Sequence, residues 1–137
     1  MTSKRNIIKY KYTDDEMMFT LIGISSHESD FRLTWNINEE MGFSFIRSGQ
    51  NIETGDGNEF AYFVHQDDDQ CLMIISNRCD NGFLIEKYKN LDFIMKFETI
   101  LNDEEIDEWI KRLRKVTLIS AAFTIQADSK FVSLQPL

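Results

Sequence analysis

The chain has one proline and six glycines among its 137 residues. Because both residue types mark turns, linkers and helix breaks, their scarcity argues against a loop-rich or segmented chain. The sequence also lacks an internal repeat or a low-complexity tract that would divide it. We therefore expect a single domain over residues 1–137, with regular elements joined by short turns and with loose ends at residues 1–6 and 127–137.

Cysteine is scarce as well. The two cysteines, Cys71 and Cys79, are too few for a disulfide framework, and Cys71 lies inside an apolar run. Free thiols of this kind are typical of a reducing compartment. The N-terminus has no secretory signal pattern, and no apolar run is long enough to span a bilayer. We therefore expect a cytoplasmic protein.

Positively charged residues are also scarce. Lysine and arginine number 15 against 23 aspartates and glutamates, which gives a formal net charge of −8. Negative charge repels phosphate backbones and anionic membrane surfaces, so neither nucleic acid nor a membrane is expected as a partner. What the chain does have is apolar content. Hydrophobic residues make up 42% of it and aromatic residues 12%, which predicts a packed core.

Two segments have the spacing of amphipathic helices. Residues 30–41 place apolar side chains at helical intervals, and Gly42 follows where a left-handed C-terminal stop belongs. The second helix begins after Asn102, which forms a capping-box pattern with Glu105 three residues later.

Period-two alternation and uncharged apolar runs predict the strands. The expected strands are residues 9–12, 17–25, 43–46, 60–64, 71–75, 83–85, 93–97 and 118–125. Residues 60–64 and 71–75 flank a short acidic turn, which predicts an antiparallel hairpin. Residues 93–97 alternate like a strand with one buried face.

The order of these elements predicts the fold class. A strand and a helix, a run of antiparallel strands, and then a second helix and strand together make an α+β domain. We expect a mostly antiparallel sheet of about five to seven strands with two helices packed on one face. Trp35 and Trp109, one on each helix, are expected to anchor the helices to the sheet.

A set of short motifs runs in order along most of the chain. The motifs are Leu21-Ile22-Gly23-Ile24-Ser25-Ser26-His27, Asp30-Phe31-Arg32-Leu33 with Trp35 and Asn38, Ile75-Ser76-Asn77-Arg78, Gly82-Phe83-Leu84-Ile85, Leu91-Asp92-Phe93 and Ala122-Phe123. Read together, they resemble the IPExxxVDY family of small bacterial proteins. The naming motif departs from the family pattern, because Glu86 and Lys87 stand where the family has Pro and Glu. The resemblance implies a single-domain cytoplasmic protein and brings no activity, substrate or cofactor with it.

The first candidate site follows the strand at residues 17–25. His27 and Arg32 stand there beside Glu28 and Asp30. His27 could act as a general base or, together with Arg32, bind an anion. In the alternative interpretation a serine caps the helix, the carboxylates complement the helix dipole and His27 is solvated.

The second candidate site is the polar turn after residues 71–75. Asn77 is one of its residues, and Arg78 could bind a carboxylate or phosphate through two N–H groups. Alternatively, Arg78 and Asp92 form a structural ion pair. If the two sites converge in space, they form one ligand-binding set. That set is His27, Arg32, Asn77 and Arg78.

No metal or cofactor site is expected. The available ligands lack the spacing of a zinc or calcium site; they are His27, His65, Cys71, Cys79 and the three aspartates at residues 67–69. Cys79 could be a reactive thiol beside Arg78 or a passive exposed one.

Two classes of function remain open. No catalytic set is complete, so a non-enzymatic protein-interaction or adaptor module is favoured over an enzyme. Its docking surface is expected on an exposed face of the sheet or on the edge strand at residues 9–12. The alternative is a small-ligand-binding protein or weak enzyme that recognises an anionic metabolite in a pocket around His27. Eleven phenylalanines in so short a chain are also consistent with a homodimer.

Overall fold

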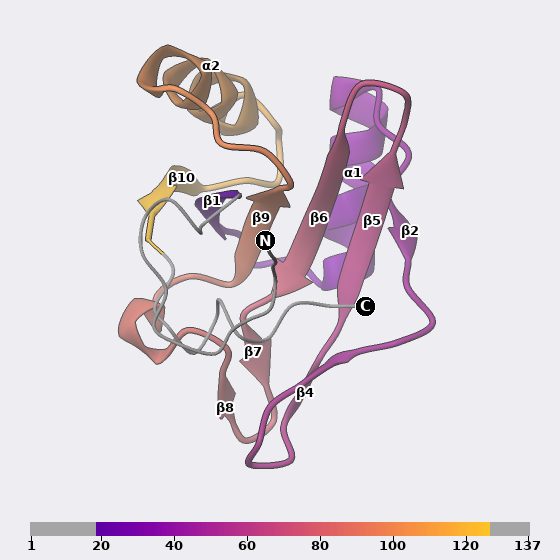
Figure 1. Ribbon diagram of the computed structural model, residues 1–137, viewed down its shortest axis with the longest axis vertical. Helices are drawn as coiled ribbons and strands as arrows, with labels where there is room; N and C mark the ends of the chain where they lie inside the picture. The colour runs from indigo at the N-terminus through magenta and orange to yellow at the C-terminus, as the bar shows by residue number, and fades with distance from the viewer. Residues whose placement is uncertain (1–18, 127–137) are drawn as a thin grey trace, which may run out of the picture.

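The computed structural model describes residues 19–126, which form a six-stranded sheet, two helices and two small hairpins (Figure 1). The helices are α1 (Asp30–Met41) and α2 (Asp103–Arg114), and a 3-10 turn, η2, covers Glu86–Tyr88. The strands are β1 (Thr20–Ser25), β2 (Ile46–Arg47), β3 (Ile52–Glu53), β4 (Glu59–Phe60), β5 (Tyr62–Gln66), β6 (Cys71–Ser76), β7 (Arg78–Cys79), β8 (Gly82–Phe83), β9 (Phe93–Phe97) and β10 (Ala121–Ile125). The strand predicted at residues 9–12 and the loose ends predicted at 1–6 and 127–137 lie outside the described residues.

The main sheet has the order β10-β1-β9-β6-β5-β2, and every neighbouring pair is antiparallel. β5 and β6 form a hairpin in which Tyr62 faces Ile75, with β2 on its outer edge and α1 behind it (Figure 1). Both helices contribute to one hydrophobic cluster with the same face of the sheet. The predicted α+β fold class and the predicted hairpin are confirmed.

The centre of the sheet is buried on both faces. Every residue of β9 is buried, and so are residues 72–75 of β6. One face packs against the helices, while residues 77–92 cover the other face with a second cluster of buried leucine and isoleucine side chains. The prediction that residues 93–97 bury one face is therefore wrong, because the alternation gave no sign of this second layer. The exposed sheet face expected as a docking surface does not exist on these central strands.

The helices are attached differently from the prediction. Leu33 and Ile37 of α1 are fully buried against the sheet, whereas the Trp35 side chain is 64% exposed. Trp35 is two residues from each of them, and a helix turns about 100° per residue, so it points to the opposite side. Trp109 of α2 does pack into the core, where its indole stacks on the Phe43 ring with centroids 5.6 Å apart. The anchoring role predicted for Trp35 is wrong, while Trp109 contributes to the helix–sheet layer.

The predicted strand at residues 43–46 is mostly replaced by irregular backbone. The structure keeps only Ile46 of it in β2, and the preceding segment is held by a side chain instead. The Nδ1 atom of His65 accepts a hydrogen bond from the Ser44 N–H at 2.9 Å. A hydrogen bond between distant parts of the chain cannot be predicted from the alternation of apolar and polar residues along one segment.

Gly23 allows residues 77–92 to close onto β1. A Cβ atom at this position would lie 2.3 Å from the Leu91 Cδ1 atom and 3.0 Å from the Ile125 Cγ2 atom. Because Leu91 is fully buried, it has little space into which it could move. The missing side chain of Gly23 is therefore a packing requirement of this layer.

Candidate functional site

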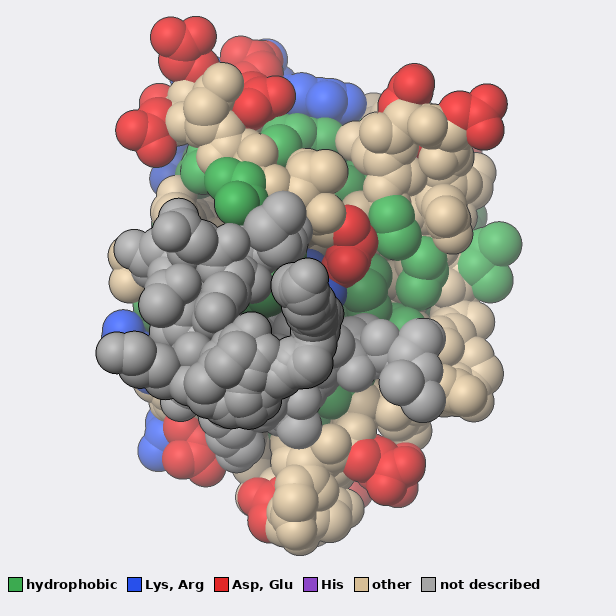
Figure 2. Space-filling view, in the orientation of Figure 1, with side chains coloured by type: hydrophobic (Ala, Val, Ile, Leu, Met, Phe, Trp, Pro, Cys, Tyr) green, Lys and Arg blue, Asp and Glu red, His purple; other side chains and the backbone are tan. Residues whose placement is uncertain are grey.

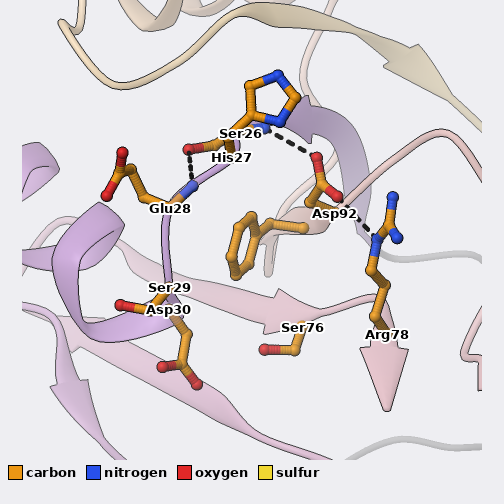
Figure 3. Close-up of a pocket in the computed structure, with 9 residues that line it drawn as sticks. Ser26, His27, Glu28, Ser29, Asp30, Ser76, Arg78 and Asp92 are labelled. Atoms are coloured by element: carbon orange, nitrogen blue, oxygen red, sulfur yellow. Dashed lines mark hydrogen bonds and ion pairs between the residues drawn. The ribbon is translucent and has the colours of Figure 1, made fainter. Parts of the chain in front are cut away.

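A pocket of about 470 Å³ lies where β1 ends and α1 begins. It is lined by Ser26, His27, Glu28, Ser29, Asp30, Ser76, Arg78, Asp92 and Phe93. These residues come from the β1–α1 connection, from the end of β6 with β7, and from the start of β9 (Figure 3). The pocket thus joins segments that are far apart in the sequence.

Short polar side chains shape the β1–α1 connection. The Ser26 hydroxyl accepts the Glu28 N–H at 3.2 Å, and the Ser29 hydroxyl accepts the Arg32 N–H at 3.3 Å. Ser29 is therefore the N-cap of α1. This agrees with the alternative interpretation of the segment, in which a serine caps the helix.

An ion pair between Arg78 and Asp92 forms one wall of the pocket. The Arg78 Nε atom lies 2.7 Å from Asp92 Oδ1, and Asp92 Oδ2 accepts the Ser26 N–H at 2.9 Å (Figure 3). Asp92 therefore ties β7 to the end of β1. The structural ion pair considered from the sequence is present, and it occupies one edge of the guanidinium that was expected to bind a ligand.

Asn77 does not line the pocket. Its side chain is fully buried. The Nδ2 group donates to the carbonyl oxygens of Tyr88 and Leu91, both at 3.0 Å, and Oδ1 accepts the Ile85 N–H at 2.8 Å. All its amide groups are thereby engaged with the backbone of the layer that covers β9. Its place is in the scaffold of the site.

Arg32 also lies outside the pocket lining. Its side chain is 69% exposed, and its Nε atom lies 2.7 Å from Glu28 Oε1. His27 is exposed, lines the pocket and has no hydrogen-bond partner for its ring among residues 19–126. Of the four predicted ligand residues, the structure brings His27 and Arg78 to one concavity and leaves Arg32 and Asn77 outside it.

The charges around the pocket are mostly negative. Glu28, Asp30 and Asp92 contribute carboxylates, against the single guanidinium of Arg78. The first N–H groups of α1 are also engaged, because Asp30 Oδ1 accepts the Phe31 N–H at 2.7 Å. The donors left for an anion include the His27 imidazole, the outer nitrogens of Arg78 and the hydroxyls of Ser29 and Ser76. Such a site can orient a small polar ligand through hydrogen bonds.

The most prominent exposed aromatic surface lies on the outer side of α1, with the Phe31 ring at its edge next to Phe63 of β5. Phe31 and Trp35 are 61% and 64% exposed, one helical turn apart. The sequence analysis missed this surface because it expected Trp35 to anchor the helix to the sheet. The positions of the two aromatic residues relative to Leu33 and Ile37 were the available signal, since residues two apart cannot share a helix face.

Comparison with protein-family models, curated proteins and solved structures finds no match to this chain. The resemblance to the IPExxxVDY family therefore stays a prediction. None of the helices in the described part of the chain is long and apolar enough to cross a membrane. Within residues 19–126, no three histidine, cysteine or acidic side chains cluster as metal ligands would.

Proposed function

We propose that this chain is a cytoplasmic protein-interaction module that binds a partner protein on the outer side of α1. The observation that carries the proposal is the exposure of Phe31 and Trp35 on one face of that helix. Exposed aromatic side chains at such spacing are the usual anchors of a helix–protein interface. The free thiols of Cys71 and Cys79 are consistent with the proposed compartment.

The aromatic pair is held on a rigid support. α1 is capped by Ser29 at its start, and at its end Gly42 adopts the left-handed conformation, with φ of 76°. The Phe31 ring also meets the Phe63 ring of β5 edge-on, with centroids 5.3 Å apart. Because the Phe31 ring is already held against Phe63, a partner that covers it costs little side-chain entropy. Full burial of an aromatic side chain removes roughly 150–250 Å² from water, and about three-fifths of each residue is still exposed here.

A photo-crosslinker tests the proposal. p-Benzoylphenylalanine in place of Trp35 samples the proposed surface, and the same residue in place of Ile100 samples another exposed apolar position, 60% exposed. Irradiation in native lysate is expected to give a discrete protein adduct at position 35 and none at position 100. Equal, diffuse labelling at both positions would contradict the proposal.

A second candidate function rests on the 470 Å³ pocket and follows the alternative derived from the sequence. A small anionic metabolite would be held there by His27 and the outer nitrogens of Arg78. A thermal-shift series with phosphate and with short dicarboxylates tests it, since a ligand at 100 times its Kd adds about 2.7 kcal/mol of stability. The shift should disappear in His27→Ala. Identical melting curves with and without these anions argue against the pocket.

A further inference from the structure

The outer surface of α1 carries charges as well as rings. Phe31 and Trp35 are flanked by Arg32 on one side and by Glu39 toward the C-terminal end, and all four side chains are exposed. We name these four residues the aromatic face. Building on the proposed function, we propose that the partner bound by the aromatic face is a second copy of this chain, joined by antiparallel pairing of two α1 helices.

A two-fold axis through Trp35 defines the pairing. Residues at equal distances before and after Trp35 then oppose each other across the axis, so the two indoles meet at the centre. Arg32 is opposite the partner's Asn38 and within one residue, roughly 1.5 Å along the helix, of the partner's Glu39. The same contact occurs twice, because the interface is symmetric.

The charge pattern selects this arrangement over the parallel one. Parallel helices related by a two-fold axis along their length would place Arg32 and Glu39 on the opposite flank from the partner's Arg32 and Glu39, so neither charge would meet its opposite. The antiparallel arrangement sets each cation near an anion. A surface that is apolar at its centre and complementary in charge to its own two-fold image matches a second copy of itself.

Charge reversals test this pairing without disturbing the core. Arg32→Glu and Glu39→Arg each place like charges at both symmetric contacts, and each is expected to weaken dimerisation about tenfold in sedimentation velocity. The double variant Arg32→Glu with Glu39→Arg restores the opposite charges and is expected to recover the wild-type Kd. Its net charge equals that of the wild type, so the recovery is not a net-charge effect.

Net charge alone predicts a different result. Starting from −8, Arg32→Glu makes the chain more negative and Glu39→Arg makes it less negative. If general repulsion controlled association, the two single variants would act in opposite directions. Weakening by both, with recovery in the double variant, supports the pairing; opposite effects, or a double variant as weak as the singles, would overturn it.

Removal of the central ring gives the second readout. Trp35→Ala is expected to abolish the dimer, while Ile100→Ala removes an exposed apolar side chain elsewhere and should leave the Kd unchanged. Far-ultraviolet circular dichroism checks that both variants remain folded. A wild-type chain that stays monomeric at several hundred micromolar overturns the dimer. The proposed function would survive that result if the crosslinker at position 35 still captured a different protein, and would fail with it if nothing were captured.

Discussion

Asn77 is a single buried amide that holds a whole layer of the molecule together. Its three side-chain hydrogen bonds reach the backbone of Ile85, Tyr88 and Leu91, within the segment that covers the far face of β9. Its own N–H donates to the Asp92 carbonyl at 2.9 Å. The wall of the pocket, formed by Asp92 and Arg78, therefore depends on a residue that never contacts the cavity.

Replacing this amide should destabilise the protein strongly. Asn77→Ala leaves buried backbone groups without partners, each costing roughly 1–3 kcal/mol, so we expect a loss of about 3 kcal/mol. Urea unfolding followed by fluorescence measures it. Asn81→Ala, at an exposed asparagine of the β7–β8 turn, is the matched control and should change stability by less than about 0.5 kcal/mol. Equal effects of the two variants would show that the Asn77 bonds are not needed.

Gly23 makes an independent prediction about packing. Gly23→Ala forces a methyl group against Leu91 and is expected to cost about 1–3 kcal/mol. Leu91→Ala opens a cavity at the same place, so the double variant should lose less stability than the sum of the single losses. Gly49→Ala is the control, since nothing lies within 4 Å of a Cβ there. Strict additivity of Gly23→Ala and Leu91→Ala would contradict this account of the contact.

Some secondary-structure elements are determined by their own residues, and others by contacts with distant parts of the chain. α1 spans the predicted residues 30–41, and α2 has the predicted capping box, because caps are made by side chains within one turn of the helix end. The irregular backbone at residues 43–45 could not be predicted from local alternation, because side chains of other elements hold it. His65 of β5 accepts a hydrogen bond from Ser44, and Asn38 of α1 bonds to the N–H and carbonyl groups of Phe45. Burial of 93–97 on both faces likewise depends on a distant layer.

In the candidate site, too, local features could be predicted from the sequence and long-range ones could not. The capping role of Ser29 is local and was among the alternatives considered. The approach of His27 to Arg78 depends on how β1 and β7 are placed by the sheet, which the sequence does not encode locally. The exposure of Trp35 was open to prediction from its position relative to Leu33, but aromatic content was given more weight than helical phase.

The hairpin of β5 and β6 provides a prediction about pH. His65 Nδ1 accepts from Ser44, so Nε2 carries the proton and donates to Asp67 Oδ2 at 2.9 Å. This bond, with the N–H groups of Asp69 and Gln70, holds the pKa of Asp67 below its ordinary value of 3.8. A lowered carboxyl pKa stabilises the fold above the unfolded pKa, and that stabilisation is lost as the pH falls through the folded pKa.

Asp67→Asn should therefore be less stable than wild type at neutral pH, and the difference should shrink as the pH is lowered below about 3.8. Urea unfolding at pH 7 and at pH 3 measures the difference in unfolding free energy between wild type and variant at each pH. Asp68→Asn, which keeps the bond to His65, is the control, and its stability difference from wild type should not shrink in this way. If the stability difference between Asp67→Asn and wild type is the same at both pH values, the role given to this carboxylate is contradicted.

At the scale of the whole molecule, one sheet is covered on both sides and one helix keeps an uncovered aromatic surface. Figure 2 shows most of the acidic side chains on one face gathered at its upper and lower ends, in keeping with the net charge of −8. General repulsion of this kind opposes non-specific association. The binding proposed for Phe31 and Trp35 therefore requires a local match in shape and charge.

The most direct test of an interaction surface on α1 is ¹⁹F NMR of the chain labelled with 5-fluorotryptophan. The chain has only two tryptophans, so the spectrum contains two resonances. Spectra are recorded from low to high protein concentration and then in native lysate, with Trp35→Phe to assign the two resonances. The account predicts that the Trp35 resonance shifts or broadens while the Trp109 resonance, from an indole packed against Phe43, stays constant. A Trp35 resonance unchanged under all these conditions would contradict an interaction surface on α1.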